Sequence, residues 1–279
     1  MKKTLETVEK NKQLVDFVIE IIDARIPGSS QNPSLTKILE DKPRLILLNK
    51  TDLAEKAKTE EWVKSLSQQD KVRAISYQAN DPGSKKRLIQ EARSLNQHLY
   101  TRWAEKGMKP QVLRAMVVGI PNSGKSTFIN TFVGKKSAKT GNRPGVTKTH
   151  QWVRMDEDLQ LLDTPGVLWP RFETERQGEN LAFTGAIRDE ILDEEELAFA
   201  LIKRLLVEFP GVLSKRYGVE ENGDPLQVYE GIGRIRGFKV RGGDVDFERT
   251  AKTLLDEFRK GQLGPITLET AGDVYGTNL

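Results

Sequence analysis

The sequence predicts an α/β fold with a mostly parallel sheet, followed by an all-helical domain. Short apolar runs alternate with stretches of helical spacing through residues 1–172. A glycine-rich loop typical of phosphate binding joins one of these runs to a helix. Beyond residue 172 only helical spacing recurs, at residues 178–188, 193–208 and 245–260. We therefore predict two domains, residues 1–172 and 173–279, a number that suits the chain length.

The first predicted domain consists of strands separated by helices. Strands are expected where residues are apolar or alternate, at 14–22, 44–48, 72–76, 112–119, 151–155 and 159–163. Helices are expected at 33–40, 55–67, 84–105 and 125–133. Because helices join most consecutive strands, the sheet should be mostly parallel and covered on both faces.

A phosphate-binding loop is predicted at residues 119–126, where the sequence GIPNSGKS matches G-x-x-x-x-G-K-[ST] at every fixed position. Its glycines let backbone N–H groups turn toward a phosphate, and the next helix directs its positive end there. Lys125 should reach the β- and γ-phosphates, and Ser126 should ligate Mg²⁺. The predicted nucleotide contacts here are Asn122, Ser123, Gly124, Lys125, Ser126 and Thr127.

A guanine-reading motif, N-K-x-D, precedes this loop at residues 49–52, directly after a predicted buried strand. The Asp52 carboxylate can accept from guanine N1–H and the exocyclic amine together, a donor pair that adenine lacks. Asn49 should support the loop, and Lys50 should lie against the purine plane. Ser76, at the end of another strand, is a candidate second wall for the base; an ordinary exit from strand to loop explains it equally well.

Two switch segments are expected after the phosphate-binding loop. Thr147 lies in a segment rich in Gly, Pro and Thr and should contact Mg²⁺ and the γ-phosphate in the GTP state, with Thr149 as a rival. Asp163, in the sequence DTPG, should hold the same ion through a water, and Gly166 should donate its N–H to the γ-phosphate. The predicted magnesium ligands are therefore Ser126, Thr147 and Asp163.

The order of these motifs is circularly permuted, because the guanine reader comes last in ordinary small GTPases. Cutting such a chain after its switch region and joining its old ends leaves the sheet unchanged. The second switch then leads directly into the C-terminal helices, and residues 168–172 resemble a hinge between them.

The charge distribution and the absence of cysteine indicate which partners and which cellular compartment suit this protein. Residues 1–179 hold 31 lysines and arginines against 22 acidic residues, and residues 180–279 hold 13 against 18. This basic first part suits a polyanionic partner such as RNA, although a plain GTPase with surface lysines looks similar. The absence of cysteine excludes disulfides and thiolate metal sites and fits a cytoplasmic protein. No apolar run approaches membrane-spanning length.

Three motifs in this order, DARIP at residues 23–27, GIPNSGKS at 119–126 and DTPGVLWP at 163–170, resemble the circularly permuted GTPases. Within these, the chain is most similar to the bacterial ribosome biogenesis GTPase A family, over nearly its whole length. The resemblance implies a late assembly factor for the large ribosomal subunit that binds its rRNA and hydrolyses GTP when docked there. Asn122 also resembles the asparagine that ligates K⁺ in potassium-activated GTPases, although an ordinary polar turn residue is an equal reading.

The catalytic residue is left unassigned. The family usually begins with a short segment whose histidine is implicated in hydrolysis, whereas this sequence begins Met1-Lys2-Lys3. Either the start is truncated or the hydrolytic machinery differs. Val167 occupies the place where Ras-like proteins have a water-orienting glutamine. Because its side chain cannot orient water by hydrogen bonding, a low intrinsic rate of hydrolysis is expected. His150, near the first switch, is a candidate replacement for the missing hydrolytic group, although an exposed loop histidine is usually only solvated.

A basic cluster marks the otherwise acidic second domain and predicts RNA contacts, although a solvated helix end and loop would look alike. Its cations are Arg234, Arg236, Lys239 and Arg241, with Phe238 among them as a stacking surface.

The sequence as a whole leads to one functional hypothesis, a GTP-hydrolysing assembly factor for the large ribosomal subunit whose nucleotide state gates docking on rRNA. The alternative is a GTP-dependent binding module with negligible hydrolysis, and Asp52 argues against an ATP-using enzyme.

Overall fold

The computed structural model describes residues 2–79, 81–132, 152–164, 168, 172, 174–187 and 193–272. The chain divides into two compact units, Met1–Arg171 with Glu269–Leu279, and Phe172–Leu268. The predicted second domain continued to residue 279, and here the structure differs. From Glu269 onward the chain belongs to the first unit, because Glu269 is buried there and Ala271 packs against its core.

The first unit contains a six-stranded sheet in the order β3-β2-β1-β4-β6-β5. All neighbouring strands are parallel except β5, which runs antiparallel to β6. The predicted mostly parallel α/β fold is therefore confirmed. The strand bounds are β1 Phe17–Asp23, β2 Arg44–Asn49, β3 Val72–Ser76, β4 Leu113–Gly119, β5 Trp152–Asp156 and β6 Leu159–Asp163.

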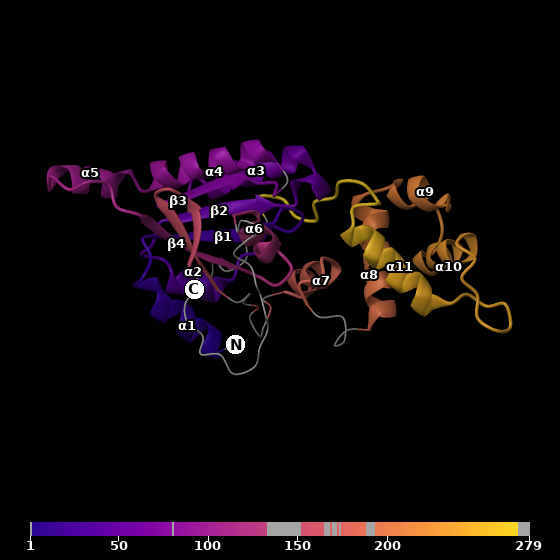
Figure 1. Cartoon of the computed structure of the whole chain (residues 1–279). Coiled ribbons are helices and arrows are strands. Elements are labelled where there is room, and N and C mark those ends of the chain that lie inside the picture. Colours follow the sequence, from indigo (N-terminus) through magenta and orange to yellow (C-terminus); the bar gives the residue numbers. More distant parts are fainter. Residues whose placement is uncertain are drawn as a thin grey trace. The chain divides into compact units, whose positions relative to one another are not determined.

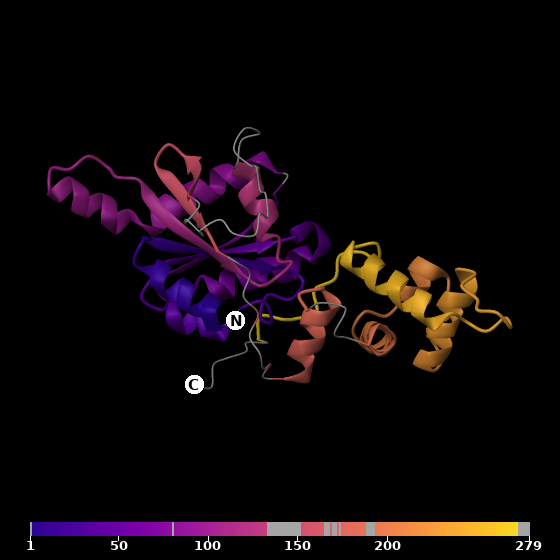
Figure 2. The same ribbon diagram turned by 60° about the horizontal axis from the view of Figure 1, so that its bottom comes forward.

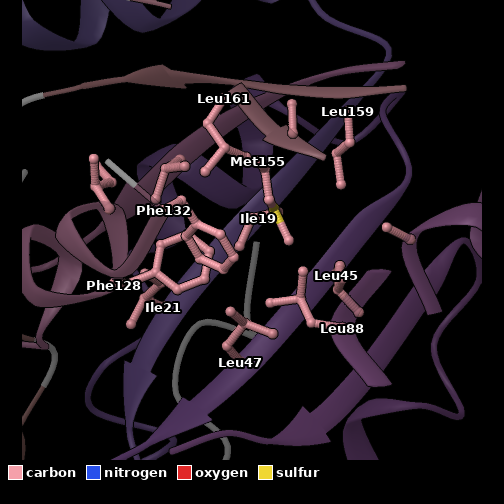
Figure 3. Close-up of a cluster of buried hydrophobic side chains, with 14 of the residues drawn as sticks. Ile19, Ile21, Leu45, Leu47, Leu88, Phe128, Phe132, Met155, Leu159 and Leu161 are labelled. Carbon is pink, nitrogen blue, oxygen red and sulfur yellow. The ribbon is translucent and has the colours of Figure 1, made fainter. Parts of the chain in front are cut away.

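The central strands are buried on both faces, which explains their nearly continuous apolar sequences. On one face, alternate residues of these strands pack against α4 (Pro82–Leu95) and α6 (Lys125–Phe132). Figure 3 shows Phe128 and Phe132 of α6 side by side, close to Ile21 of β1. Their rings meet edge to face with centroids 5.1 Å apart. This packing fixes the helix that follows the phosphate-binding loop.

The other face is covered by α1 (Lys2–Lys12), α2 (Pro33–Ile38) and α3 (Lys56–Leu66). Val8 and Leu35 pack with Val18 of β1, whereas Trp62 of α3 packs with Ile46 of β2. Both views show α1 and α2 on the side of the sheet opposite α4 (Figures 1 and 2). The sheet is thus enclosed between two helical layers, as the alternating pattern predicted.

The long helix predicted at residues 84–105 is interrupted. It forms α4 and α5 (Gln97–Glu105), which meet at Asn96. The buried Asn96 side chain donates from Nδ2 to the Ala92 carbonyl, 2.8 Å away. Asparagine side chains compete in this way for backbone groups and weaken a continuous helix.

The second unit is helical in its described part, with α7 Glu175–Phe183, α8 Glu194–Glu208, α9 Val212–Tyr217, α10 Pro225–Ile235 and α11 Phe247–Arg259. Helices α8, α10 and α11 pack against one another (Figure 1). Asp193, Asp224 and Asp246 cap the first turns of these three helices. Gly233 allows α10 to lie close to Val245, because a Cβ at this position would be 2.4 Å from Val245 Cγ1. Across the described residues, no helix is long and apolar enough to cross a membrane.

Candidate guanine-nucleotide site

Motifs that are far apart in sequence meet at one edge of the sheet. The carboxyl ends of β1, β2, β4 and β6 lie together there because these strands are parallel. Asp23 of β1 is in register with Asn49 of β2, and Ile21 of β1 is in register with Gly119 of β4. Such an edge is where open α/β sheets bind ligands. The guanine motif and the phosphate-binding loop therefore face the same region.

The two loops are joined directly by hydrogen bonds. The buried Asn49 donates from Nδ2 to the Ser123 carbonyl at 2.8 Å, and Lys50 donates from Nζ to the Asn122 carbonyl at 2.6 Å. A Cβ at Gly124 would lie 2.1 Å from Asn49 Nδ2, and Gly124 has a φ of +95°. Glycine is therefore required for Asn49 to approach the phosphate-binding loop.

Two non-glycine residues of these loops adopt the left-handed backbone region. Lys50 has a φ of 61° and Asn122 a φ of 57°. Such conformations are uncommon for residues with a Cβ and persist where the surrounding contacts determine them. The hydrogen bond between these same two residues supplies one such contact.

Three predicted contacts are presented at the edge for a ligand. Asp52, in the short 3₁₀ turn Thr51–Leu53, is exposed, and so are Ser126 and Thr127 in the first turn of α6. Ser76 is half-buried at the end of β3, in register with Leu48 of the strand that leads into the guanine motif. The predicted residues Asn49, Lys50, Asp52, Asn122, Ser123, Gly124, Lys125, Ser126 and Thr127 thus lie on the two joined loops and α6.

Lys125 and Asp163 form an ion pair, with 2.9 Å between Lys125 Nζ and Asp163 Oδ1. This contact brings the β6 carboxylate beside the residue that precedes Ser126. Within the described part of the chain no three His, Cys, Asp or Glu side chains form a metal-binding group. A hydroxyl and a carboxylate suit Mg²⁺, which usually takes only one or two protein oxygens and completes its shell with phosphates and water. Ser126 and Asp163 therefore fit this ion.

Several predicted residues lie outside the described part. These are Thr147 and Thr149 of the first switch, His150, Gly166 and Val167 of the second switch, and residues 169–171 of the predicted hinge. Of the two histidines, His98 is described and lies on α5. Helix α5 lines a cavity together with Leu14, Asp16 and Arg114, which lie at the amino ends of β1 and β4. That cavity is at the opposite edge of the sheet, so His98 is not part of the nucleotide edge.

The sequence reasoning assigned no role to Asp23, which the structure places under the guanine motif. Its carboxylate contacts the guanidinium of Arg25 at 2.7 Å and Nζ of Lys50 at 2.9 Å. Burial alone would raise the pKa of Asp23, but the two cations outweigh it and hold the pKa well below its usual range. The sequence signal that could have identified Asp23 is an acidic residue at the end of the apolar run FVIEIID.

The predicted RNA-binding cations follow α10 in the second unit. Arg234 pairs with Glu230 at 2.8 Å, and Arg236 pairs with Glu257 at 2.6 Å. Lys239 and Arg241 are exposed and form no ion pair within the described residues. The ring of Phe238, expected to stack on a base, has the guanidinium carbon of Arg249 4.3 Å from its centroid. Of the four predicted cations, Lys239 and Arg241 are therefore more available for an external ligand than Arg234 and Arg236.

Comparison with known proteins agrees with this geometry. A family model described as "50S ribosome-binding GTPase" matches residues 114–220. A curated relative, ribosome biogenesis GTPase A of Priestia megaterium, is 41% identical over 271 residues, covering 96% of this chain and 94% of the relative. The chain belongs to the ribosome biogenesis GTPase A family. The family member of Thermotoga maritima is 27% identical over 277 residues and covers 98% of this chain.

A solved structure supports the same assignment. The crystal structure of GNP-bound YlqF from T. maritima is 25% identical, has a TM-score of 0.67 and covers 98% of this chain and all of that chain. The family resemblance and the fold predicted from the sequence are therefore both confirmed. Membership makes the chain a GTP-binding protein of the GTPase class.

Proposed function

We propose that this chain is a GTP-hydrolysing assembly factor for the large ribosomal subunit, whose nucleotide state controls docking on rRNA. The observation that carries the nucleotide part is the pair of hydrogen bonds from Asn49 and Lys50 to the phosphate-binding loop. The ribosomal part is supported by the names of its relatives and by the description of the matching family model.

In this proposal each loop has a separate task. Asp52 accepts from the guanine N1–H and amine, Lys50 lies along the purine plane, and Ser76 closes the other side of the base. Lys125 exchanges its contact with Asp163 for the β- and γ-phosphates, while Ser126, Thr147 and Asp163 hold Mg²⁺. Asn122 is the candidate ligand for K⁺, which would add positive charge near the reacting phosphate.

Hydrolysis is proposed to be slow in the free protein and faster on the subunit. Val167 lacks the hydrogen-bonding side chain that orients water in Ras-like proteins, and the subunit is proposed to raise the rate by supplying or ordering an activating group. Measuring GTP turnover with and without immature large subunits tests this. Turnover that stays negligible on subunits, together with GTP-dependent docking, would instead identify a binding module.

The base-reading role is tested with Asp52→Asn. The amide presents a donor where the carboxylate presents an acceptor, which matches the carbonyl at position 2 of xanthine. GTP affinity should fall by about 1–3 kcal/mol, and XTP should become the preferred nucleotide in competition binding. A variant that keeps the original preference for GTP would show that another residue reads the base.

The coupling of nucleotide state to docking is tested by comparing subunit affinity with GDP and with a non-hydrolysable GTP analogue. The second switch leads along the chain into the helical unit, so the γ-phosphate should favour docking. Coupling energies are typically about 1–3 kcal/mol, which corresponds to roughly 5- to 150-fold tighter binding with the analogue. Gly166→Ala should remove the difference while GDP binding remains. Equal affinities in the two states would refute the switch.

A further inference from the structure

The Asp23 carboxylate is fully engaged beneath the guanine motif. Its Oδ1 accepts from Arg25 N at 3.1 Å and from Arg25 Nε at 2.9 Å. Its Oδ2 accepts from the Arg25 guanidinium at 2.7 Å and from Lys50 Nζ at 2.9 Å. Asp23 is only 2% exposed. Two cations are thereby oriented by one buried carboxylate.

Lys50 links this carboxylate to the phosphate-binding loop. Its Nζ donates both to Asp23 and to the Asn122 carbonyl, so Asp23 fixes the end of the side chain that spans the two loops. Lys50 also has a left-handed backbone, a conformation that persists where surrounding contacts such as these two determine it. Loss of the carboxylate would free Lys50 to move away from the purine plane.

Asp23 also balances the charge of Arg25 close to the guanine motif. Arg25 is 1% exposed and also interacts favourably with the charge of Asp52. Arg25, Lys50, Asp23 and Asp52 together form a neutral set of two cations and two anions. If Asp23 lost its charge, Arg25 and Lys50 would both attract Asp52 and compete with guanine for its oxygens.

A second buried carboxylate fixes the turn that follows Asp23. Glu269, 1% exposed, accepts from Gly28 N at 2.6 Å, from Ser29 N at 3.1 Å and from the Ser29 hydroxyl. The adjacent Ser30 then accepts from Asp23 N through its hydroxyl oxygen at 3.1 Å. Along the chain, Glu269 directly follows the last residue of the helical unit.

We propose that Asp23 and Glu269 are positioning residues for guanine recognition, Asp23 by direct contact with Lys50 and Arg25, and Glu269 through the turn at residues 28–30. The proposal rests on the base-reading role proposed for Asp52. It makes the segment that returns from the helical unit part of the support of the nucleotide site.

The test measures the affinities of GDP and IDP for the full chain, since IDP lacks only the 2-amino group that Asp52 would accept from. Asp23→Asn should weaken GDP binding by about tenfold or more and bring the GDP-to-IDP affinity ratio close to one. The matched control is Glu20→Gln. Glu20 lies on the same strand, is 3% exposed and pairs with Arg44 at 3.3 Å, but does not contact either loop. It should change the melting temperature and leave the ratio unchanged.

Glu269→Gln should shift the ratio in the same direction by a smaller factor, because one amide oxygen replaces two acceptor oxygens. Ser29→Ala removes one donor to the same carboxylate and should give a still smaller shift. If Asp23→Asn does not fold, Asp23→Glu, which keeps the charge but displaces it, should show the intermediate loss.

Asp52→Asn is measured in the same series. A normal ratio in Asp52→Asn overturns the base-reading assignment and the positioning proposal together. A reduced ratio in Asp52→Asn with normal ratios in the Asp23 variants overturns the positioning role alone. Glu269 variants that lower only the melting temperature restrict Glu269 to a stabilising role and overturn its part of the proposal.

Discussion

Each unit of the protein contains a carboxylate that is paired with two cations, and the two clusters differ in what they connect. In the first unit, Asp23 contacts Arg25 and Lys50. In the helical unit, Glu257 of α11 contacts Arg216 of α9 at 2.8 Å and Arg236, next to α10, at 2.6 Å. The hydroxyl of Tyr217 also donates to Glu257 at 2.9 Å.

The surroundings of these two carboxylates determine their roles. Asp23 joins loops with unusual backbone conformations at the ligand-binding edge, and the side chain of its partner Arg25 is 1% exposed. Glu257 joins regular helices, and the side chains of its arginines are 31% and 33% exposed. Similar ion pairs therefore join loops at the proposed nucleotide edge in one unit and hold helices together in the other. Arg236, predicted as an RNA contact, is partly committed to this second task.

The largest effect is expected from Lys125→Ala, which acts only on the first unit. Removing a charge-assisted contact to the phosphates should cost about 2–5 kcal/mol of GTP binding. Equilibrium titration with GTP measures this, and Lys56→Ala, which changes an exposed lysine of α3, is the control. If Lys125→Ala retained wild-type affinity, the phosphate-binding role of residues 119–126 would be wrong.

A smaller effect on a different property is expected from Glu257→Gln. Burial alone would raise the pKa of Glu257, but hydrogen bonds from Arg216 and Tyr217 and the charge of Arg236 lower it. Neutralising the carboxylate should cost about 1–3 kcal/mol of unfolding free energy, less than for a fully buried pair because the arginines are partly hydrated. GTP affinity should stay unchanged, which would separate the two clusters.

The same pKa shift predicts an acid dependence. A lowered folded-state pKa contributes stability above the ordinary value of 4.5, and this stability is lost as the pH falls through the folded-state value. Thermal unfolding at pH 5.5 and at lower pH should therefore show wild type and Glu257→Gln converging on acidification. A constant difference between them at all pH values would exclude ionised Glu257 as the source.

The smallest effect on stability is expected from Lys239→Ala combined with Arg241→Ala. Both side chains are exposed beyond α10, so the unfolding free energy should change by less than about 0.5 kcal/mol. Subunit binding should weaken, and the slope of log affinity against log salt should fall by about one for each lost phosphate contact. Lys252→Ala on α11 is the control. An unchanged slope would place the RNA contacts elsewhere.

The sequence predicted the sheet and the two nucleotide loops because these depend on local signals. Continuous apolar runs identify buried strands, and the fixed letters around Gly124 and Lys125 reflect backbone geometry within a few residues. The interruption at Asn96 was missed because a single polar residue scarcely alters a helical pattern. Helix α10 was missed because Gly231 and Gly233 lower its helix propensity, although Gly233 allows close packing.

The role of Glu269 lay beyond sequence reasoning for a different reason. Its partners Gly28 and Ser29 are 241 and 240 residues away along the chain, and no periodic pattern relates the two segments. Asp23 presented a related difficulty, since an aspartate at the end of a strand is compatible with many environments. Only the folded arrangement shows that Asp23 contacts Lys50 of the guanine motif and that Glu269 binds the turn that follows Asp23.

The position of Glu269 in the sequence also determines when its contacts can form during synthesis of the chain. The strands, the guanine motif and the phosphate-binding loop all emerge before the helical unit, whereas Glu269 emerges after it. Until then, the backbone N–H groups of Gly28 and Ser29 lack the carboxylate that binds them in the folded protein. In the positioning role proposed for Glu269, a nascent chain completes its nucleotide site only after the ribosome has translated the helical unit.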